Sequence, residues 1–159
     1  SDIDSDEYQN SLDYKNYLGF NLVLYNQDKI NICSSRGKEI IKEKDKIFVI
    51  GNKAFGTSSN KLDLAKKEFD QILNTNFTNE DLLNLMQSPQ ESYDFDQKKL
   101  SENHGNEFSA RFIHSSIYGT RSTTVMTIDK NNYIEIKEQL YDQNGKIGQE
   151  KEFKFKVSL

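Results

Sequence analysis

The stretch SSIYGTRSTTVMTID, Ser115–Asp129, carries the clearest structural signal in this chain. Its second half is rich in Thr and Val, which is typical of a β-strand. Gly119 lets the backbone turn tightly just before that strand. Arg121 is therefore expected at the head of the strand, where its rigid fork of donors suits a carboxylate or an oxyanion. From spacing alone, a surface arginine paired with an acidic neighbour is the commoner interpretation.

Alternating or apolar runs on both sides of this stretch predict further strands. The predicted order is four strands, two helices and four strands, with the strands at residues 20–26, 29–35, 39–42, 46–51, 107–115, 122–129, 132–140 and 152–157. In the last strand, Phe153, Phe155 and Val157 are expected to face inward, and Lys154 and Lys156 outward. Asp142–Gly145 is the hairpin turn before that strand.

Between these two groups of strands, apolar residues recur at the spacing of a helix rather than that of a strand. Residues 62–73 repeat apolar side chains at helical spacing, and Ser58–Asn60 offers several N-caps. A second helix is expected from Thr78, with Asp81 closing a capping box and Pro89 ending the helix. The polar residues that follow predict a long exposed loop over 88–106. The predicted fold class is therefore α+β, with helices packed on antiparallel sheets.

The composition argues against several classes of protein, including nucleic-acid-binding and membrane-spanning proteins. The 159 residues suit one ordinary domain, and the net charge of −4 argues against nucleic acid as a default partner. No run approaches the length of a membrane span, and a single cysteine favours a reducing compartment. Cys33 lies within an apolar strand, which favours a buried core residue.

His104 and His114 do not form a metal-ligand spacing with Cys33, so no metal is predicted. Asn52 follows a buried strand, and its amide could donate to an oxyanion, although Asn is often only a turn-former.

Several segments in a fixed order resemble a known family. They are YLGFNLVLYNQ, IGNKAFGTSSNKLDLAKKEF, IYGTRSTTVMTID and EFKFKV. Together they resemble the C-terminal part of the transport-and-Golgi-organisation protein 2 family, also called the NRDE family. That family resembles N-terminal-nucleophile hydrolases, whose αββα sandwich places two antiparallel sheets between helix layers. The resemblance implies that residues 17–159 form the C-terminal part of such a sandwich, after a disordered acidic linker or arm over residues 1–16.

The resemblance also implies roles for individual residues. In the cysteine branch of that superfamily, the nucleophile follows the initiator Met and an Asn-Arg-Asp-Glu segment lines the site. Asn52 and Arg121 match the family's later positions, which implies supporting catalytic roles for both and ligand contacts by Asn52, Tyr118 and Arg121. The nucleophile and the NRDE segment would lie upstream of Ser1. Cys33 cannot replace that nucleophile, because it lies mid-strand without a free α-amino group.

Three functions follow from the resemblance. The first is the handling of a small amphipathic ligand, in haem or acyl-lipid trafficking, with haem as cargo rather than cofactor. The second is an amide hydrolase completed by a cysteine on an upstream fragment of the same protein. The third is a non-catalytic structural subunit. The expected location is the cytoplasm, with the mitochondrion and the Golgi as alternatives, and neither nucleic acid nor a transmembrane segment is expected.

Overall fold

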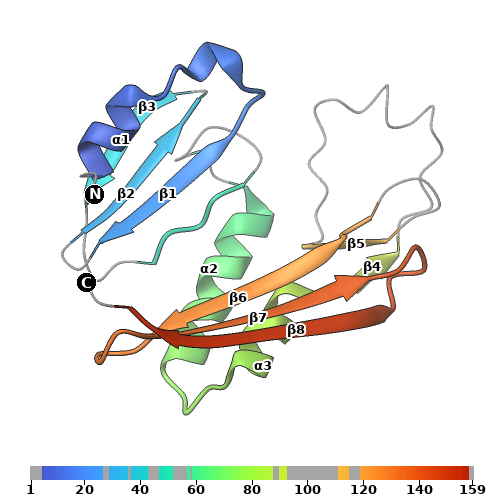
Figure 1. Ribbon diagram of the computed structural model, residues 1–159. Coiled ribbons are helices and arrows are strands. Elements are labelled where there is room, and N and C mark those ends of the chain that lie inside the picture. The colour runs from blue at the N-terminus through green and yellow to red at the C-terminus, as the bar shows by residue number, and fades with distance from the viewer. Residues whose placement is uncertain are drawn as a thin grey trace, which may run out of the picture. The chain divides into compact units, whose positions relative to one another are not determined.

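A computed structural model describes residues 5–26, 29–35, 37–42, 47–51, 57, 59–87, 90–92, 111–114 and 119–157. The chain divides into two compact units, with the boundary between Lys66 and Lys67. Figure 1 shows the elements of both units.

The described elements are helices and short β-sheets, grouped in blocks along the chain. The first unit contains α1 (Ser5–Ser11), a 3-10 helix η1 (Tyr14–Asn16), β1 (Asn21–Asn26), β2 (Lys29–Ser34), β3 (Gly37–Lys42) and the start of α2 (Asn60–Leu73). The second contains the rest of α2, α3 (Asn79–Gln87), β4 (Gln90–Ser92), β5 (Phe112–His114), β6 (Ser122–Ile128), β7 (Tyr133–Tyr141) and β8 (Ile147–Lys156). Strands β1-β2-β3 and β6-β7-β8 form two antiparallel sheets, and β4 pairs with β5 in parallel. The predicted α+β class is confirmed.

The first unit is built on the β1–β2 hairpin, which the sequence predicted. Ile32 and Cys33 of the central strand are buried, at 1% and 3% exposure. Helix α1 contacts both β1 and β2, and the Tyr14 ring stacks on Phe20 with the ring centroids 5.6 Å apart. Residues 5–16 therefore hold regular structure, where composition favoured a disordered arm. The domain boundary at residue 16 stays a prediction.

The predicted strand over residues 46–51 is wrong, because the described residues 47–51 have no strand structure. A short apolar run makes a strand only where a neighbouring strand supplies hydrogen-bond partners for its backbone. The segment is held by a side chain instead, since Asn21 Nδ2 donates to the carbonyl of Gly51 at 2.9 Å. A Cβ at Gly51 would lie 3.2 Å from Leu62 Cδ1, so the glycine permits a close approach to α2.

Local capping chemistry sets the helix starts as predicted. The backbone N–H of Leu62 donates to Ser59 Oγ at 3.4 Å, so Ser59 caps α2. Asp81 Oδ2 accepts from the backbone N–H and from the hydroxyl of Thr78, each at 2.8 Å. The backbone N–H of Asp81 donates to Thr78 Oγ1 at 3.4 Å, which completes the capping box.

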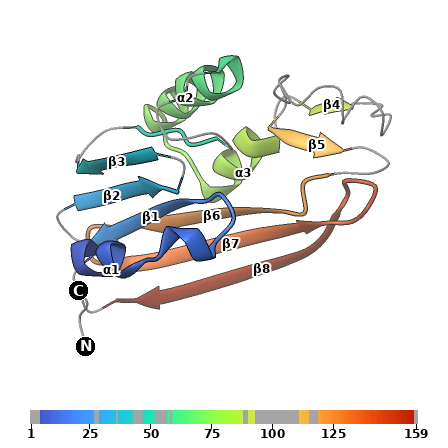
Figure 2. The same cartoon turned by 90° about the horizontal axis from the view of Figure 1, so that it is seen from above.

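The β6–β7–β8 sheet is a meander in the second unit (Figure 2). Tight turns join its strands: Asn132 has a φ of 62° between β6 and β7, and Gly145 has a φ of 72° between β7 and β8. The predicted Asp142–Gly145 turn is confirmed, because Asp142 Oδ1 accepts from the backbone N–H groups of Asn144 and Lys146 at 2.8 and 2.9 Å. Side-chain hydrogen bonds between α3 and this sheet place the helix against one of its faces.

Two other predictions for this unit are wrong. Phe153 and Phe155 were expected to face inward, yet they are 54% and 47% exposed, and every residue of β8 is exposed. The reason is that α3 covers the opposite face of the sheet. The predicted loop over 88–106 also contains a short strand, since Gln90–Ser92 pairs in parallel with Phe112–His114.

Candidate functional site

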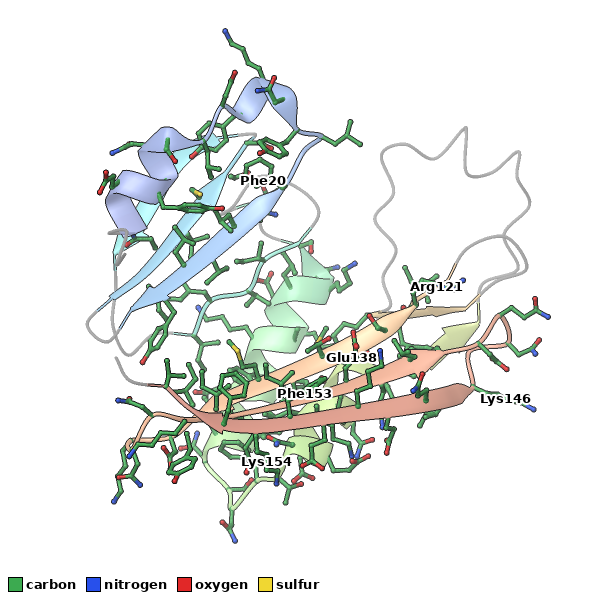
Figure 3. The ribbon with its side chains drawn as sticks, viewed as in Figure 1. Phe20, Arg121, Glu138, Lys146, Phe153 and Lys154 are labelled. Carbon is green, nitrogen blue, oxygen red and sulfur yellow. The ribbon has the colours of Figure 1, made fainter. Side chains whose placement is uncertain are left out.

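Arg121 stands at the head of β6 on a backbone that is fixed on both sides. Before it, Thr120 is joined to β5: its N–H donates to the Ile113 carbonyl at 2.8 Å, and its Oγ1 accepts from the Ile113 N–H at 2.9 Å. The Arg121 carbonyl accepts from the backbone N–H of Tyr141 at 2.9 Å, which continues the β6–β7 ladder. The Arg121 side chain is exposed and projects from the sheet (Figure 3). Arg121 therefore presents a guanidinium from a fixed backbone position.

A buried polar network lies beside Arg121, on the face of the sheet that α3 covers. Thr123, Gln139 and Tyr141 are 7%, 1% and 5% exposed. The Tyr141 hydroxyl donates to Thr123 Oγ1 at 3.1 Å, and Gln87 Nε2 of α3 donates to Gln139 Oε1 at 2.9 Å. Gln139 Nε2 then donates to Glu150 Oε1 of β8 at 2.7 Å. Buried polar groups are stable only when their partners are supplied, and here each partner comes from a different element.

Other contacts from α3 reach the same side of the sheet. Asn79 Nδ2 donates to Glu135 Oε2 at 3.2 Å, and Lys137 Nζ donates to Glu80 Oε2 at 2.8 Å. Leu83, in the middle of α3, is fully buried at 0% exposure. We call this side of the sheet the helix-covered face; its residues are Thr123, Val125, Glu135, Lys137, Gln139 and Tyr141.

On the opposite side of the sheet, the part nearest the turn between β6 and β7 is apolar and partly exposed. The register places Met126, Ile136 and Phe153 in one row across the three strands. The next row consists of Ile128, Ile134 and Phe155. We call these six residues the open face. Met126 and Phe153 are 56% and 54% exposed, so this surface remains available to an apolar group. Figure 3 shows Phe153 and Lys154 on opposite sides of β8.

Charged groups along β7 and β8 are paired with each other. The hydrogen bond to Glu80 raises the pKa of Lys137, and contact with Glu150 acts in the same direction. The hydrogen bonds to Glu152 and then Glu135 raise the pKa of Lys154. These lysines therefore stay protonated at neutral pH and belong to ion-pair clusters at the surface.

An ion pair joins α2 to the segment before β5. The Arg111 side chain is 4% exposed and pairs with Glu68, whose side chain is 31% exposed. Next to it, the Phe112 ring meets the Tyr141 ring edge to face, with the centroids 4.8 Å apart. Arg111 therefore anchors the strand that carries the Thr120 contacts of the Arg121 segment. Arg111 could not be singled out from the sequence, because one arginine within the predicted strand over residues 107–115 gives no signal of burial.

The structure places only some of the predicted site residues. Asn52, Tyr118 and His104 lie outside the described residues, so their roles stay predictions. Cys33 is buried, as predicted. Its neighbour Tyr14 has a raised pKa, caused first by burial and then by contact with the Cys33 thiol. Of the predicted ligand contacts, Arg121 is described, and it is exposed at the head of β6.

The sequence analysis missed the polar network beside Arg121. Thr123, Gln139 and Tyr141 are polar residues at alternate positions of two neighbouring strands. Such a pattern normally indicates the side of a sheet that faces solvent. A signal was present in the pairing of β6 with β7, because Thr123 lies directly opposite Gln139. That pairing can be read only after the strand register is known.

Comparisons with known proteins identify the family. A model of the family described as Transport and Golgi organisation 2 matches residues 1–143. A comparison with curated proteins finds no match. None of the described helices is long and apolar enough to cross a membrane. Because the family model matches well over half of the chain, this protein belongs to the Transport and Golgi organisation 2 family.

Proposed function

We propose that this chain binds a small amphipathic ligand and supports its transfer, and that the ligand is an acyl carboxylate of the kind handled in lipid trafficking. One observation carries this proposal: a single sheet presents both an exposed cation and an exposed apolar surface. Arg121 supplies the cation at the head of β6. Met126, Phe153 and Phe155 supply apolar surface at the other end of the sheet.

The chemistry of the two ends is complementary to an amphipathic molecule. A guanidinium binds a carboxylate through two parallel hydrogen bonds, which are stronger than hydrogen bonds between neutral groups. The open face gains free energy by removing apolar ligand surface from water, at about 25 cal/mol per Å². Both contributions depend on a ligand that carries the two kinds of group at once.

The length of β6 bears on the choice between acyl lipid and haem. Arg121 and Ile128 are separated by seven residue steps along the strand, or roughly 24 Å at about 3.4 Å per residue. Side chains alternate between the two faces along a strand, so this odd spacing places Arg121 on the side of Thr123 and Ile128 on the open face. An extended, flexible acyl chain can bend around the edge of β6 to contact both, whereas a rigid ring system cannot. We therefore place the acyl carboxylate first and keep haem as the alternative cargo.

The test is a fluorescence titration of the purified chain with a fluorescent long-chain fatty acid. Arg121→Ala should weaken binding about tenfold or more, because a hydrogen bond to a charged group contributes about 1.5–3 kcal/mol. Arg121→Lys should restore part of the affinity, since the charge returns without the planar fork. Lys146→Ala is the matched control, because it removes one exposed cation from the turn between β7 and β8 (Figure 3).

Two results would contradict the proposal. Equal losses in Arg121→Ala and Lys146→Ala would indicate general charge attraction, without a specific contact at Arg121. Unchanged binding in Arg121→Ala, with cooperative unfolding intact, would remove the residue from any ligand site. A parallel titration with haemin, followed by its absorption spectrum, separates the two cargoes: tighter binding of haemin than of fatty acid would favour the alternative.

A further inference from the structure

Strand β8 is a long exposed edge of the β6–β7–β8 sheet. Within the described part of the chain, β7 is its sole pairing partner, and all ten of its residues are exposed. Figures 1 and 2 both show β8 at the margin of the sheet, with β7 between it and β6. An edge strand carries unpaired backbone N–H and C=O groups that can accept another strand.

The order of charges along β8 is self-complementary. On the helix-covered side of the strand, Glu150 and Glu152 are followed by Lys154 and Lys156. When a second β8 lies antiparallel to the first with Phe153 opposite Phe153, Glu150 faces Lys156 and Glu152 faces Lys154. Every charged pair on that side is then attractive, and the two-fold symmetry produces each pair twice.

The same arrangement continues the open face across the interface. Phe153 of one copy meets Phe153 of the other, and Phe155 meets the aliphatic stem of Lys151. Aromatic pairs directly opposite each other are among the favourable cross-strand contacts. The two open faces would then form one apolar surface on a six-stranded sheet.

Other registers are disfavoured by charge. Side chains keep their faces only if the pairing shifts by two residues at a time. A shift in one direction places Glu152 opposite Glu152, and a shift in the other places Lys154 opposite Lys154. Charged residues on an edge usually prevent pairing. Here each neighbouring register has one like-charged pair at its centre and two attractive pairs, whereas the register centred on Phe153 has four attractive pairs and no like-charged pair.

We propose that β8 pairs with β8 of a second copy of this chain, antiparallel and centred on Phe153, to form a two-fold dimer. β8 begins at Ile147, after the last residue that the family model matches, so the proposal rests on features of this chain. The dimer does not require the ligand, because the backbone edge and the charges on the helix-covered side lie outside the proposed ligand surface; Phe153 and Phe155 are common to both proposals.

The test is sedimentation of the purified chain over a range of concentrations. The parent chain should show a monomer–dimer equilibrium that weakens as salt is added, since exposed ion pairs are screened. Lys154→Glu and Glu152→Lys should each raise the dimer dissociation constant at least tenfold, because each creates like charges at the central pairs. Lys130→Glu is the control: it makes the same charge reversal at an exposed residue of the turn between β6 and β7, outside the proposed pairing of β8.

Mixing the two single variants gives the decisive result. In the mixture, the lysine introduced at position 152 of one copy faces the glutamate introduced at position 154 of the other. The unchanged Lys154 of the first copy faces the unchanged Glu152 of the second, so every central pair is attractive again. The mixture should therefore form a heterodimer although each variant alone is monomeric. This rescue also distinguishes lost pairing from lost folding, since a misfolded variant would not be rescued by its partner.

A disulfide tests the register. Phe153→Cys should form a disulfide-linked dimer under mild oxidation, because the two residues lie opposite each other at the symmetry axis. Gln149→Cys, on the same side of β8, should not, and Cys33 is buried. A parent chain that stays monomeric, a mixture that fails to associate, or equal cross-linking at both positions would each overturn the proposal.

Discussion

The face of the β6–β7–β8 sheet that α3 covers holds the buried polar residues Thr123 and Gln139, whereas the opposite face leaves Met126 and Phe153 about half exposed. A half-buried antiparallel sheet normally shows the reverse arrangement, with apolar residues under the helix. The helix-covered face is stable because α3 and β8 supply hydrogen-bond partners for its polar groups. In this sheet, hydrogen-bond partners from α3 and β8 therefore allow the helix to cover the more polar face.

The largest expected effect is at Leu83, where α3 meets the sheet. Leu83→Ala should lower the free energy of unfolding by about 2–5 kcal/mol, because a fully buried leucine leaves a cavity when it is truncated. Met86→Ala on the same helix should cost less than about 1 kcal/mol, since Met86 is 43% exposed. Urea denaturation of both variants measures the difference. Equal costs would show that α3 is not packed on the helix-covered face through Leu83.

A smaller effect is expected from the polar network. Gln139→Ala removes the partner of Gln87 and Glu150, and it should cost about 1–3 kcal/mol because Gln87 loses a hydrogen bond beneath the helix. Gln143→Ala, in the exposed turn after β7, is the matched control and should change stability little. If Gln139→Leu proved more stable than the parent, the network would cost stability and would need another explanation.

Local features of this fold could be predicted from the sequence, and the arrangement of faces could not. The Ser59 cap, the Thr78–Asp81 capping box and the Asp142–Gly145 turn depend on residues a few positions apart, so their chemistry is visible in the sequence. The orientation of Phe153 depends on where α3 packs, which is a contact across more than sixty residues. The same limit applies to residues 46–51. Their apolar run favours a strand, but whether a strand forms depends on a pairing partner that the sequence does not reveal.

Some residues of the candidate site could likewise be predicted from the sequence, and others could not. Arg121 could be singled out because a glycine turn precedes it and a strand follows it. Its buried neighbours Gln139 and Tyr141 could not, because their side chains meet only after β6 and β7 pair. The role of Asn52 and the αββα sandwich both stay predictions.

The smallest expected effect is the pH dependence of the α3 cap. Hydrogen bonds from the Thr78 side chain and backbone lower the pKa of Asp81 below its ordinary value of 3.8. A lowered pKa means that the stabilisation is present above about 3.8 and is lost as the pH falls through the lower folded-state value. Asp81→Asn should therefore unfold with a weaker acid dependence than the parent chain. Parallel acid titrations of the two proteins, followed by circular dichroism, check this; identical curves would contradict it.

The open face is proposed as a ligand-binding surface, and Phe153→Ser is the sharpest test of that role. The measurement pairs urea denaturation with the fatty-acid titration on the same protein. Because about half of the Phe153 side chain is already exposed, we expect a stability loss of about 1 kcal/mol together with clearly weaker ligand binding. A loss of about 3–5 kcal/mol, as for a core phenylalanine, or unchanged ligand binding, would contradict it.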